Sequence, residues 1–194
     1  YRCPLMSLPL AFHTDLRTIP AETPYLGADP ARIEAWRTRL GPAAGPRIGI
    51  AWSGRPAFRN DHNRSIRLEG FLPLLTDAAT FVCLQKELRD HDRELLARHP
   101  RIRYVGAELN DFGDTAALVE CLDLVISVDT SVAHLAGALG KPTWILLPYH
   151  PDWRWLLDRE DSPWYSGVRL FRQPRPGDWD SVIARVAAEL REPR

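Results

Sequence analysis

The chain has 194 residues, 45% of them hydrophobic and 26% charged, which is typical of one globular domain with a short appendage. Its 25 basic side chains balance 25 acidic ones, and this zero formal net charge excludes the long-range positive field that attracts nucleic acid or an anionic membrane. No apolar run approaches the ~20 residues that span a bilayer, so a membrane span is excluded as well.

The first 28 residues are rich in proline and show no helical period, so this segment is predicted to be an extended tail or linker. Its opening lacks an initiator methionine and a signal peptide, which suggests a cut inside a longer polypeptide. A short helix is expected over 31–40, because Pro30 suits the first helical position. Residues 41–46 form a hinge-like break, so we divide the chain into a linker over 1–46 and a domain over 47–194.

From Arg47 onward, short runs that are apolar on both faces alternate with helical stretches. Such runs favour strands buried inside a parallel sheet, and their alternation with helices implies right-handed βαβ units. We therefore predict an α/β fold with a Rossmann-like, doubly wound sheet of six parallel strands. The expected strands are 48–52, 80–85, 102–105, 124–128, 143–147 and 168–171. The expected helices are 68–75, 88–98, 115–122, 131–139 and 179–190.

The three cysteines show no spacing typical of a metal site or a disulfide framework. Cys83 and Cys121 lie in apolar stretches and are predicted to be small core residues, which favours a reducing, cytoplasmic location. The histidines form no cluster that supports a metal site, and no Gly-x-Ser-x-Gly elbow supports a hydrolase. The sequence therefore predicts neither a metal nor a cofactor.

Ligands of an open parallel sheet bind at the carboxyl ends of its strands, so the residues that follow each strand are the candidates for a site. The loop over 53–65 follows the first strand and holds several cations and hydroxyls. Ser53 and Gly54 are expected to bring a hydroxyl and backbone N–H groups to phosphate oxygens, with Arg64 as a bidentate donor. The loop matches neither the dinucleotide fingerprint nor a Walker loop, and a solvated surface loop is the alternative.

The stretch after the fourth strand begins a helix with Asp129, Thr130 and Ser131. A helix N-terminus presents unpaired N–H groups and a positive dipole end, so it suits a diphosphate. Asp129 is expected to accept hydrogen bonds from sugar hydroxyls, although Asp129 or Thr130 as a simple N-cap is the alternative. His134 lies one turn after Thr130 on the same face, which predicts either a phosphate contact or ordinary packing.

Three further loops carry weaker candidates. After the second strand, we expect either that Lys86 meets phosphate or that Gln85 and nearby backbone contact a base, with a solvated lysine as the alternative. The loop over 108–114 is expected to supply an acidic N-cap, and a base contact there has little support. After the fifth strand, Tyr149 and Trp153 belong to a rigid aromatic segment that suits either stacking on a sugar or base or covering the sheet edge.

The stretch over 129–142, Asp-Thr-Ser-Val-Ala-His-Leu-Ala-Gly-Ala-Leu-Gly-Lys-Pro, resembles the signature of the family 9 glycosyltransferases, the ADP-heptose:lipopolysaccharide heptosyltransferase type. Stretches 63–66, 151–157 and 161–165 are similar to those of its tetratricopeptide-containing bacterial relatives, and 3–9 resembles the end of their N-terminal lobe. The resemblance implies a GT-B architecture of two Rossmann-like lobes without a metal requirement. By motif position, it makes Ser53 the phosphate-loop hydroxyl, makes Asp129 and Thr130 the donor-contacting pair, and places Arg64 near a phosphate-binding lysine.

The resemblance further implies that this chain is the C-terminal lobe, which binds a nucleotide-diphosphate sugar in an inverting hexosyl or heptosyl transferase. The catalytic carboxylate of the family lies in the N-terminal lobe, so no catalytic residue is expected here and the chain alone is expected to be inactive. Its expected partners are that N-terminal lobe and upstream tetratricopeptide repeats. The alternative is a non-catalytic scaffold or sensor attached to such repeats. An epimerase is less favoured, because no acid/base pair follows the strands.

Overall fold

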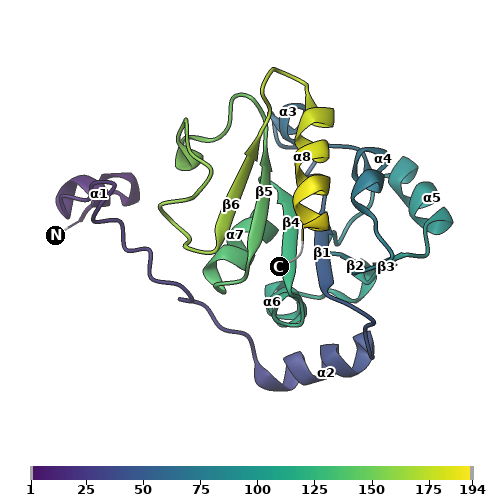
Figure 1. The fold of residues 1–194 in the computed structure, drawn as a ribbon. Coiled ribbons are helices and arrows are strands. Elements are labelled where there is room, and N and C mark those ends of the chain that lie inside the picture. The colour runs from purple at the N-terminus through teal and green to yellow at the C-terminus, as the bar shows by residue number, and fades with distance from the viewer. Residues whose placement is uncertain (1, 193–194) are drawn as a thin grey trace.

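Six parallel strands form one sheet at the centre of the computed structural model, which describes residues 2–192 (Figure 1). The strands are β1 Arg47–Ala51, β2 Thr80–Cys83, β3 Ile102–Tyr104, β4 Leu124–Val128, β5 Thr143–Leu147 and β6 Val168–Arg172. Their order is β3-β2-β1-β4-β5-β6, and every neighbouring pair is parallel. The chain thus reverses direction across the sheet between β1 and β4, where doubly wound sheets open a ligand crevice. The predicted fold is confirmed.

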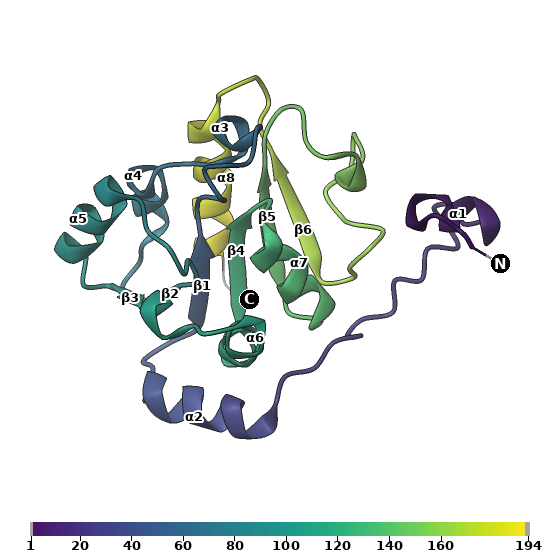
Figure 2. The same cartoon turned by 180° about the vertical axis from the view of Figure 1, so that it is seen from behind.

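Helices cover both faces of the sheet (Figures 1 and 2). One face carries α4 Leu68–Phe71, α5 Asp90–Arg98 and α8 Trp179–Arg191, and the other carries α2 Pro30–Leu40, α6 Phe112–Glu120 and α7 Ser131–Ala138. The alternation of side chains along β1 serves both layers. Ile48 and Ile50 pack in the cluster that contains Val182 of α8, whereas Ala51 packs in the cluster that contains Leu118 of α6.

The structure moves several expected helix boundaries. The helix expected over 68–75 is split into α4 and a 3-10 helix, Leu72–Leu74, because Pro73 cannot donate a helical hydrogen bond. Helix α6 begins at Phe112 and not at residue 115, because the Asp111 side chain caps it by accepting from the N–H of Asp114. Asp111 is therefore the acidic N-cap that the sequence predicted. Three further short helices were not expected, namely α3 Asp61–Arg64 and the 3-10 helices Gly106–Glu108 and Trp153–Trp155.

The sequence predicted an extended N-terminal segment, but the structure shows helical turns in part of it. It begins with a 3-10 turn, Leu5–Ser7, and one helical turn, α1 Leu8–Ala11. Pro9 stands in the first turn of α1, where its missing N–H group does not interrupt a helical hydrogen bond. Farther on, the N–H groups of Tyr25 and Leu26 donate to the carbonyl of Ala138, so the segment contacts the C-terminal end of α7 before it enters α2.

No helix among the described residues is long and apolar enough to cross a membrane. Cys83 and Cys121 are buried and carry free thiols, as expected of core cysteines. Burial raises the pKa of the Cys83 thiol to about 12 and also raises that of Cys121. Both thiols are therefore protonated at neutral pH and behave as small apolar side chains.

Candidate functional site

A cavity of about 890 Å³ opens where β1, β2 and β4 end. This volume lies within the range of small-molecule pockets. The cavity joins the loop after β1, the loop after β2, the start of α6 and the start of α7. Of the residues that the sequence singled out, the cavity is lined by Ser53, Gly54, Arg64, Gln85, Lys86, Thr130 and Ser131. Ser53 and Thr130 therefore lie at the same rim of the sheet, which the donor-site interpretation requires.

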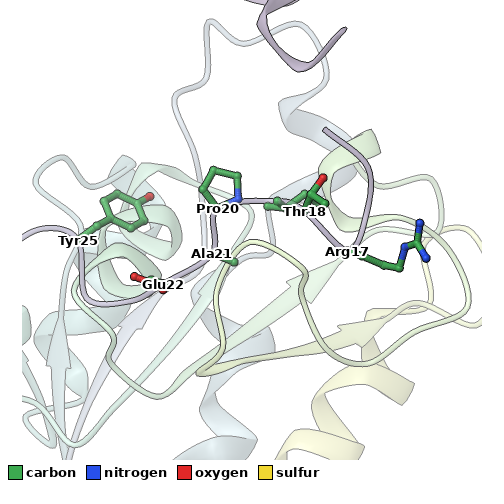
Figure 3. Close-up of a pocket in the computed structure, with 7 residues that line it drawn as sticks. Arg17, Thr18, Pro20, Ala21, Glu22 and Tyr25 are labelled. Carbon is green, nitrogen blue, oxygen red and sulfur yellow. The ribbon is translucent and has the colours of Figure 1, made fainter. Parts of the chain in front are cut away.

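A second hollow, of about 610 Å³, lies along the N-terminal segment (Figure 3). Arg17–Glu22 and Tyr25 line it, and all of them belong to one stretch of chain. None of the predicted site residues takes part. The cavity at the sheet rim is therefore the candidate site.

Gln85 fixes the loop that follows β1. Its buried amide oxygen accepts hydrogen bonds from the N–H groups of Trp52 and Ser53, both at 2.9 Å, and its Nε2 donates to Ser53 Oγ at 2.9 Å. The N–H of Gly54 donates to Ser65 Oγ at 2.9 Å. The backbone donors expected to reach phosphate from Ser53 and Gly54 thus have partners within the chain. The side-chain amide of Gln85, which was expected to contact a base, instead makes hydrogen bonds to this loop.

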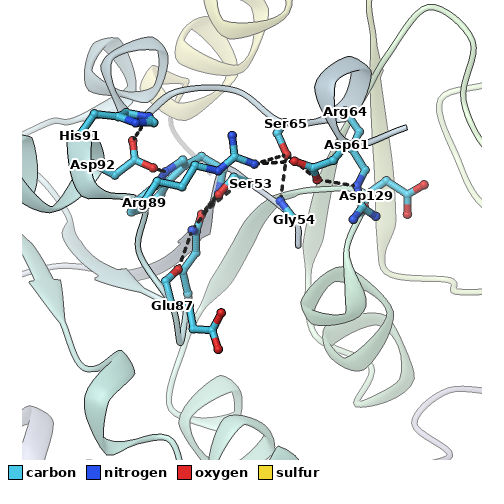
Figure 4. A network of polar contacts seen from close by, with 12 residues as sticks. Ser53, Gly54, Asp61, Arg64, Ser65, Glu87, Arg89, His91, Asp92 and Asp129 are labelled. Atoms are coloured by element: carbon cyan, nitrogen blue, oxygen red, sulfur yellow. Dashed lines mark hydrogen bonds and ion pairs between the residues drawn. The ribbon is translucent and has the colours of Figure 1, made fainter. Parts of the chain in front are cut away.

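Asp61 is the centre of a polar network at the cavity wall (Figure 4). Its side chain is buried, and its Oδ1 accepts from Ser65 Oγ at 2.9 Å and from Arg64 Nε at 3.2 Å. Its Oδ2 pairs with the guanidinium of Arg89, which also lines the cavity. Neither Asp61 nor Arg89 was a candidate from sequence. The available signal was the position of Arg89, a cation between the second strand and the helix that follows it.

Arg64 is held from three sides. Besides its contact with Asp61, its Nη1 donates to the carbonyl of Asp129 at 2.8 Å, and its guanidinium lies 4.3 Å from the ring centroid of Phe58. These contacts connect α3 to the end of β4. They leave a positive charge at the cavity, next to the first turn of α7.

The start of α7 faces the same cavity. Thr130 is the N-cap residue, but its side chain makes no capping hydrogen bond and instead lies 3.1 Å from Ser127 Oγ. An α-helix leaves its first N–H groups without intrahelical partners, and the helix dipole places a partial positive charge there. Thr130, Ser131 and Val132 line the cavity, so its wall includes this partly positive end of α7, a chemical environment that suits an anion.

Asp129 and His134 do not line the cavity and interact with each other. His134 Nε2 lies 3.5 Å from Asp129 Oδ1, and His134 Nδ1 lies 3.1 Å from the hydroxyl of Tyr165. The His134 ring stacks on buried Trp155 with ring centroids 5.1 Å apart. Burial acts to raise the pKa of Asp129, but His134 and the charge of Arg64 outweigh it, so that pKa lies below its usual value.

Of the three remaining predicted site residues, one lines the cavity and two lie outside it. Lys86 lines the cavity and donates from Nζ to the carbonyl of Asn110 at 3.1 Å. Tyr149 and Trp153 are exposed and lie outside the cavity lining. Trp153 packs edge-on against Trp164, with centroids 6.1 Å apart. Within residues 2–192, no three His, Cys, Asp or Glu side chains are grouped as metal ligands.

Comparison with known proteins identifies a related group. Residues 77–155 match the family model described as glycosyltransferase family 9 (heptosyltransferase). The chain is also 31% identical over 183 residues to Protein FlbA of Caulobacter vibrioides, an alignment that covers 89% of this chain and 30% of that protein. The chain therefore spans under a third of this curated relative.

Solved structures share the fold at low sequence identity. E. coli ADP-heptose lps heptosyltransferase II superposes with a TM-score of 0.55 at 16% identity, over 89% of this chain and 56% of that one. E. coli heptosyltransferase WaaC with ADP gives 0.53 at 17% identity, over 90% and 53%. A glycosyl transferase family 9 protein of Veillonella parvula gives 0.56 at 13% identity, over 85% and 52%. The chain thus spans about half the length of these structures.

Proposed function

We propose that this chain, a member of glycosyltransferase family 9, is the lobe that binds the nucleotide-diphosphate sugar in an inverting, metal-independent transferase. The observation that carries the proposal is the cavity at the carboxyl ends of the strands. There the guanidinium of Arg64 and the positive end of α7 converge beside the hydroxyls of Ser53 and Thr130. This set of groups suits a diphosphate without a metal or a cofactor.

In the proposed reaction, an acceptor hydroxyl oxygen bonds to the sugar carbon from the face opposite the diphosphate. The bond between that carbon and the diphosphate oxygen breaks, and its electron pair stays on the leaving group. Arg64 and the α7 dipole stabilise the negative charge that develops there, which is the electrostatic part of catalysis. The acceptor proton passes to a base that we assign to a separate N-terminal lobe, so this chain alone is expected to be inactive.

The proposal includes partners that lie outside this chain. The heptosyltransferases and FlbA are longer than this chain, which leaves room for an N-terminal lobe and for tetratricopeptide repeats. The free, buried thiols of Cys83 and Cys121 favour a reducing compartment, and we propose the cytoplasm.

A second candidate function, a non-catalytic scaffold or sensor, is favoured by one feature of the loop after β1. The N–H groups of Ser53 and Gly54 are bonded within the chain and not left for a ligand.

Calorimetric titration with ADP, GDP and UDP tests the proposal. We expect at least one of them to bind with a dissociation constant between micromolar and millimolar, and the corresponding nucleoside to bind more weakly, because the diphosphate makes the charge-assisted contacts. Arg64→Gln should weaken diphosphate binding. A wild-type chain that binds none of the three diphosphates overturns the proposal and leaves the scaffold as the better interpretation.

A further inference from the structure

Arg89 lines the cavity together with Arg55 and Arg64, and neither the sequence motifs nor the family signature assigns Arg89 a role. It is the N-cap residue of α5 and lines the cavity. Its guanidinium pairs with Asp61, and its Nη2 lies 3.4 Å from Ser65 Oγ. Its Nε is shielded from solvent and has no hydrogen-bond partner among residues 2–192. A shielded guanidinium N–H without an acceptor is unfavourable. Because Nε is shielded, a ligand in the cavity meets the exposed part of the Arg89 side chain, which amounts to 30% of it.

Asp61 determines where the two arginines stand. One of its carboxylate oxygens holds Arg64 and the other holds Arg89. Asp61 is only 5% exposed to solvent. Two guanidiniums carry two positive charges and the carboxylate carries one negative charge, so the group retains one net positive charge beside the cavity. A carboxylate shared by two guanidiniums also restricts the rotamers of both side chains, which lowers the entropy that they lose when a ligand binds.

We propose that Arg89 is a second diphosphate-binding residue, and that Asp61 is a positioning residue that holds Arg64 and Arg89 as a two-armed clamp. The inference rests on the proposed function and adds to it a preference for a diphosphate over a monophosphate. Arg64 reaches the cavity from α3 beside the end of β4, whereas Arg89 reaches it from the loop after β2. A diphosphate offers a charged group to each arm, and a monophosphate offers only one.

The first test compares Arg89→Gln with Arg98→Gln. The control removes the same charge from the last turn of α5, where Arg98 is exposed and does not line the cavity. The probes are ADP, GDP or UDP, whichever the wild type binds, together with the matching monophosphate and nucleoside. We expect Arg89→Gln to weaken diphosphate binding about tenfold or more, as the loss of a hydrogen bond to a charged group does, and to leave nucleoside binding unchanged. Arg98→Gln should match the wild type for all three.

The second test measures the coupling through Asp61. Because both arms share this carboxylate, the effects of Arg64→Gln and Arg89→Gln on diphosphate affinity should not be additive in the double variant. Asp61→Asn should lower the ratio of diphosphate to nucleoside affinity, although it adds positive charge at the site. A rise in that ratio would show that Asp61 only screens the arginines. Should Asp61→Asn fail to fold in thermal unfolding, the additivity of the arginine variants decides.

The outcomes separate the two levels of the argument. A wild type that binds no nucleoside diphosphate overturns the proposed function itself. A wild type that binds, with Arg89→Gln indistinguishable from Arg98→Gln, overturns the clamp and leaves the proposed function standing. Additive arginine variants overturn the positioning role of Asp61, even where Arg89 is shown to bind phosphate.

Discussion

Gly54 belongs to the loop after β1 and lies against the side chain of Arg64. A Cβ atom at this position would lie 2.3 Å from Arg64 Nη2 and 2.7 Å from Asp61 Oδ1. The guanidinium therefore packs directly on the backbone of Gly54, and any other residue must displace it. This explains the presence of glycine by a side-chain contact across the loop, and the sequence had suggested only a backbone approach to phosphate.

Gly54→Ala should therefore weaken ligand binding more than it destabilises the fold. The new methyl group moves the flexible end of Arg64 away from Asp61, so we expect diphosphate affinity to fall about fivefold to tenfold, with a change in unfolding free energy below about 1 kcal/mol. Calorimetry and urea denaturation measure the two effects. Gly27→Ala is the matched control, because nothing lies within 4 Å of its Cβ position. An unchanged affinity in Gly54→Ala would show that the position of Arg64 does not matter for binding.

At the residue scale, strand-end positions predicted part of the site. Ser53, Arg64 and Thr130 line one cavity because parallel strands end at the same edge of a sheet. Sequence reasoning missed Asp61 and Arg89, because their pairing joins residues 28 positions apart through loops whose path no local pattern specifies.

The elements around the cavity are held by a second buried carboxylate. Asp92 of α5 is fully buried, and its Oδ2 accepts from Trp52 Nε1 at 3.0 Å. Its Oδ1 accepts from the N–H of Leu68, the first residue of α4, at 3.1 Å. This one side chain thus connects α4, α5 and the residue that follows β1. It fixes the loop that bears Ser53 relative to the helices of this face.

Asp92→Ala should destabilise the protein by about 3 kcal/mol, because it leaves two buried N–H groups without an acceptor. The free energy of unfolding from urea denaturation measures the effect. Glu94→Ala is the control on the same helix, because Glu94 is exposed, and it should change the stability by less than about 0.5 kcal/mol. Equal stabilities of the two variants would contradict the connecting role of Asp92.

Element type was more predictable than element boundaries. All six strands were expected because each is a short, largely apolar run between turn residues. The inner strands β1, β2, β4 and β5 are buried almost throughout, whereas the edge strands β3 and β6 are partly exposed. Helix starts were less accurate, since they depend on which polar side chain caps the first turn. At α6, Asp111 was one of several acidic candidates, and the capping bond to Asp114 selects it.

At the scale of the whole molecule, α2 attaches the N-terminal part of the chain to the sheet domain. Trp36 is 5% exposed and packs in the cluster that contains α6. Arg32 Nη1 lies 2.7 Å from Asp111 Oδ1, in a loop that lines the cavity. The division at residues 46 and 47 was based on the Gly/Pro-rich hinge, and a break in local pattern does not reveal whether the preceding helix packs on the domain.

The packing of α2 predicts how two truncations of the chain change its stability. Residues 18–194 retain α2 and the contacts of Tyr25 with α7, so their unfolding free energy should stay within about 1 kcal/mol of the full chain. Residues 47–194 lose the buried Trp36 and expose the apolar side of α6, so they should be less stable by about 3 kcal/mol or more, as for the loss of a buried aromatic side chain.

Urea denaturation of the full chain and the two truncated chains measures these differences, and Trp36→Ala in the full chain separates the loss of one side chain from the loss of the helix. Trp36→Ala should account for most of the difference between residues 18–194 and residues 47–194, because Trp36 is the largest buried side chain of α2. A 47–194 chain as stable as the full chain would contradict the packing argument. In that case the hinge at 41–46, and not the beginning of α2, marks where the independently folding domain begins.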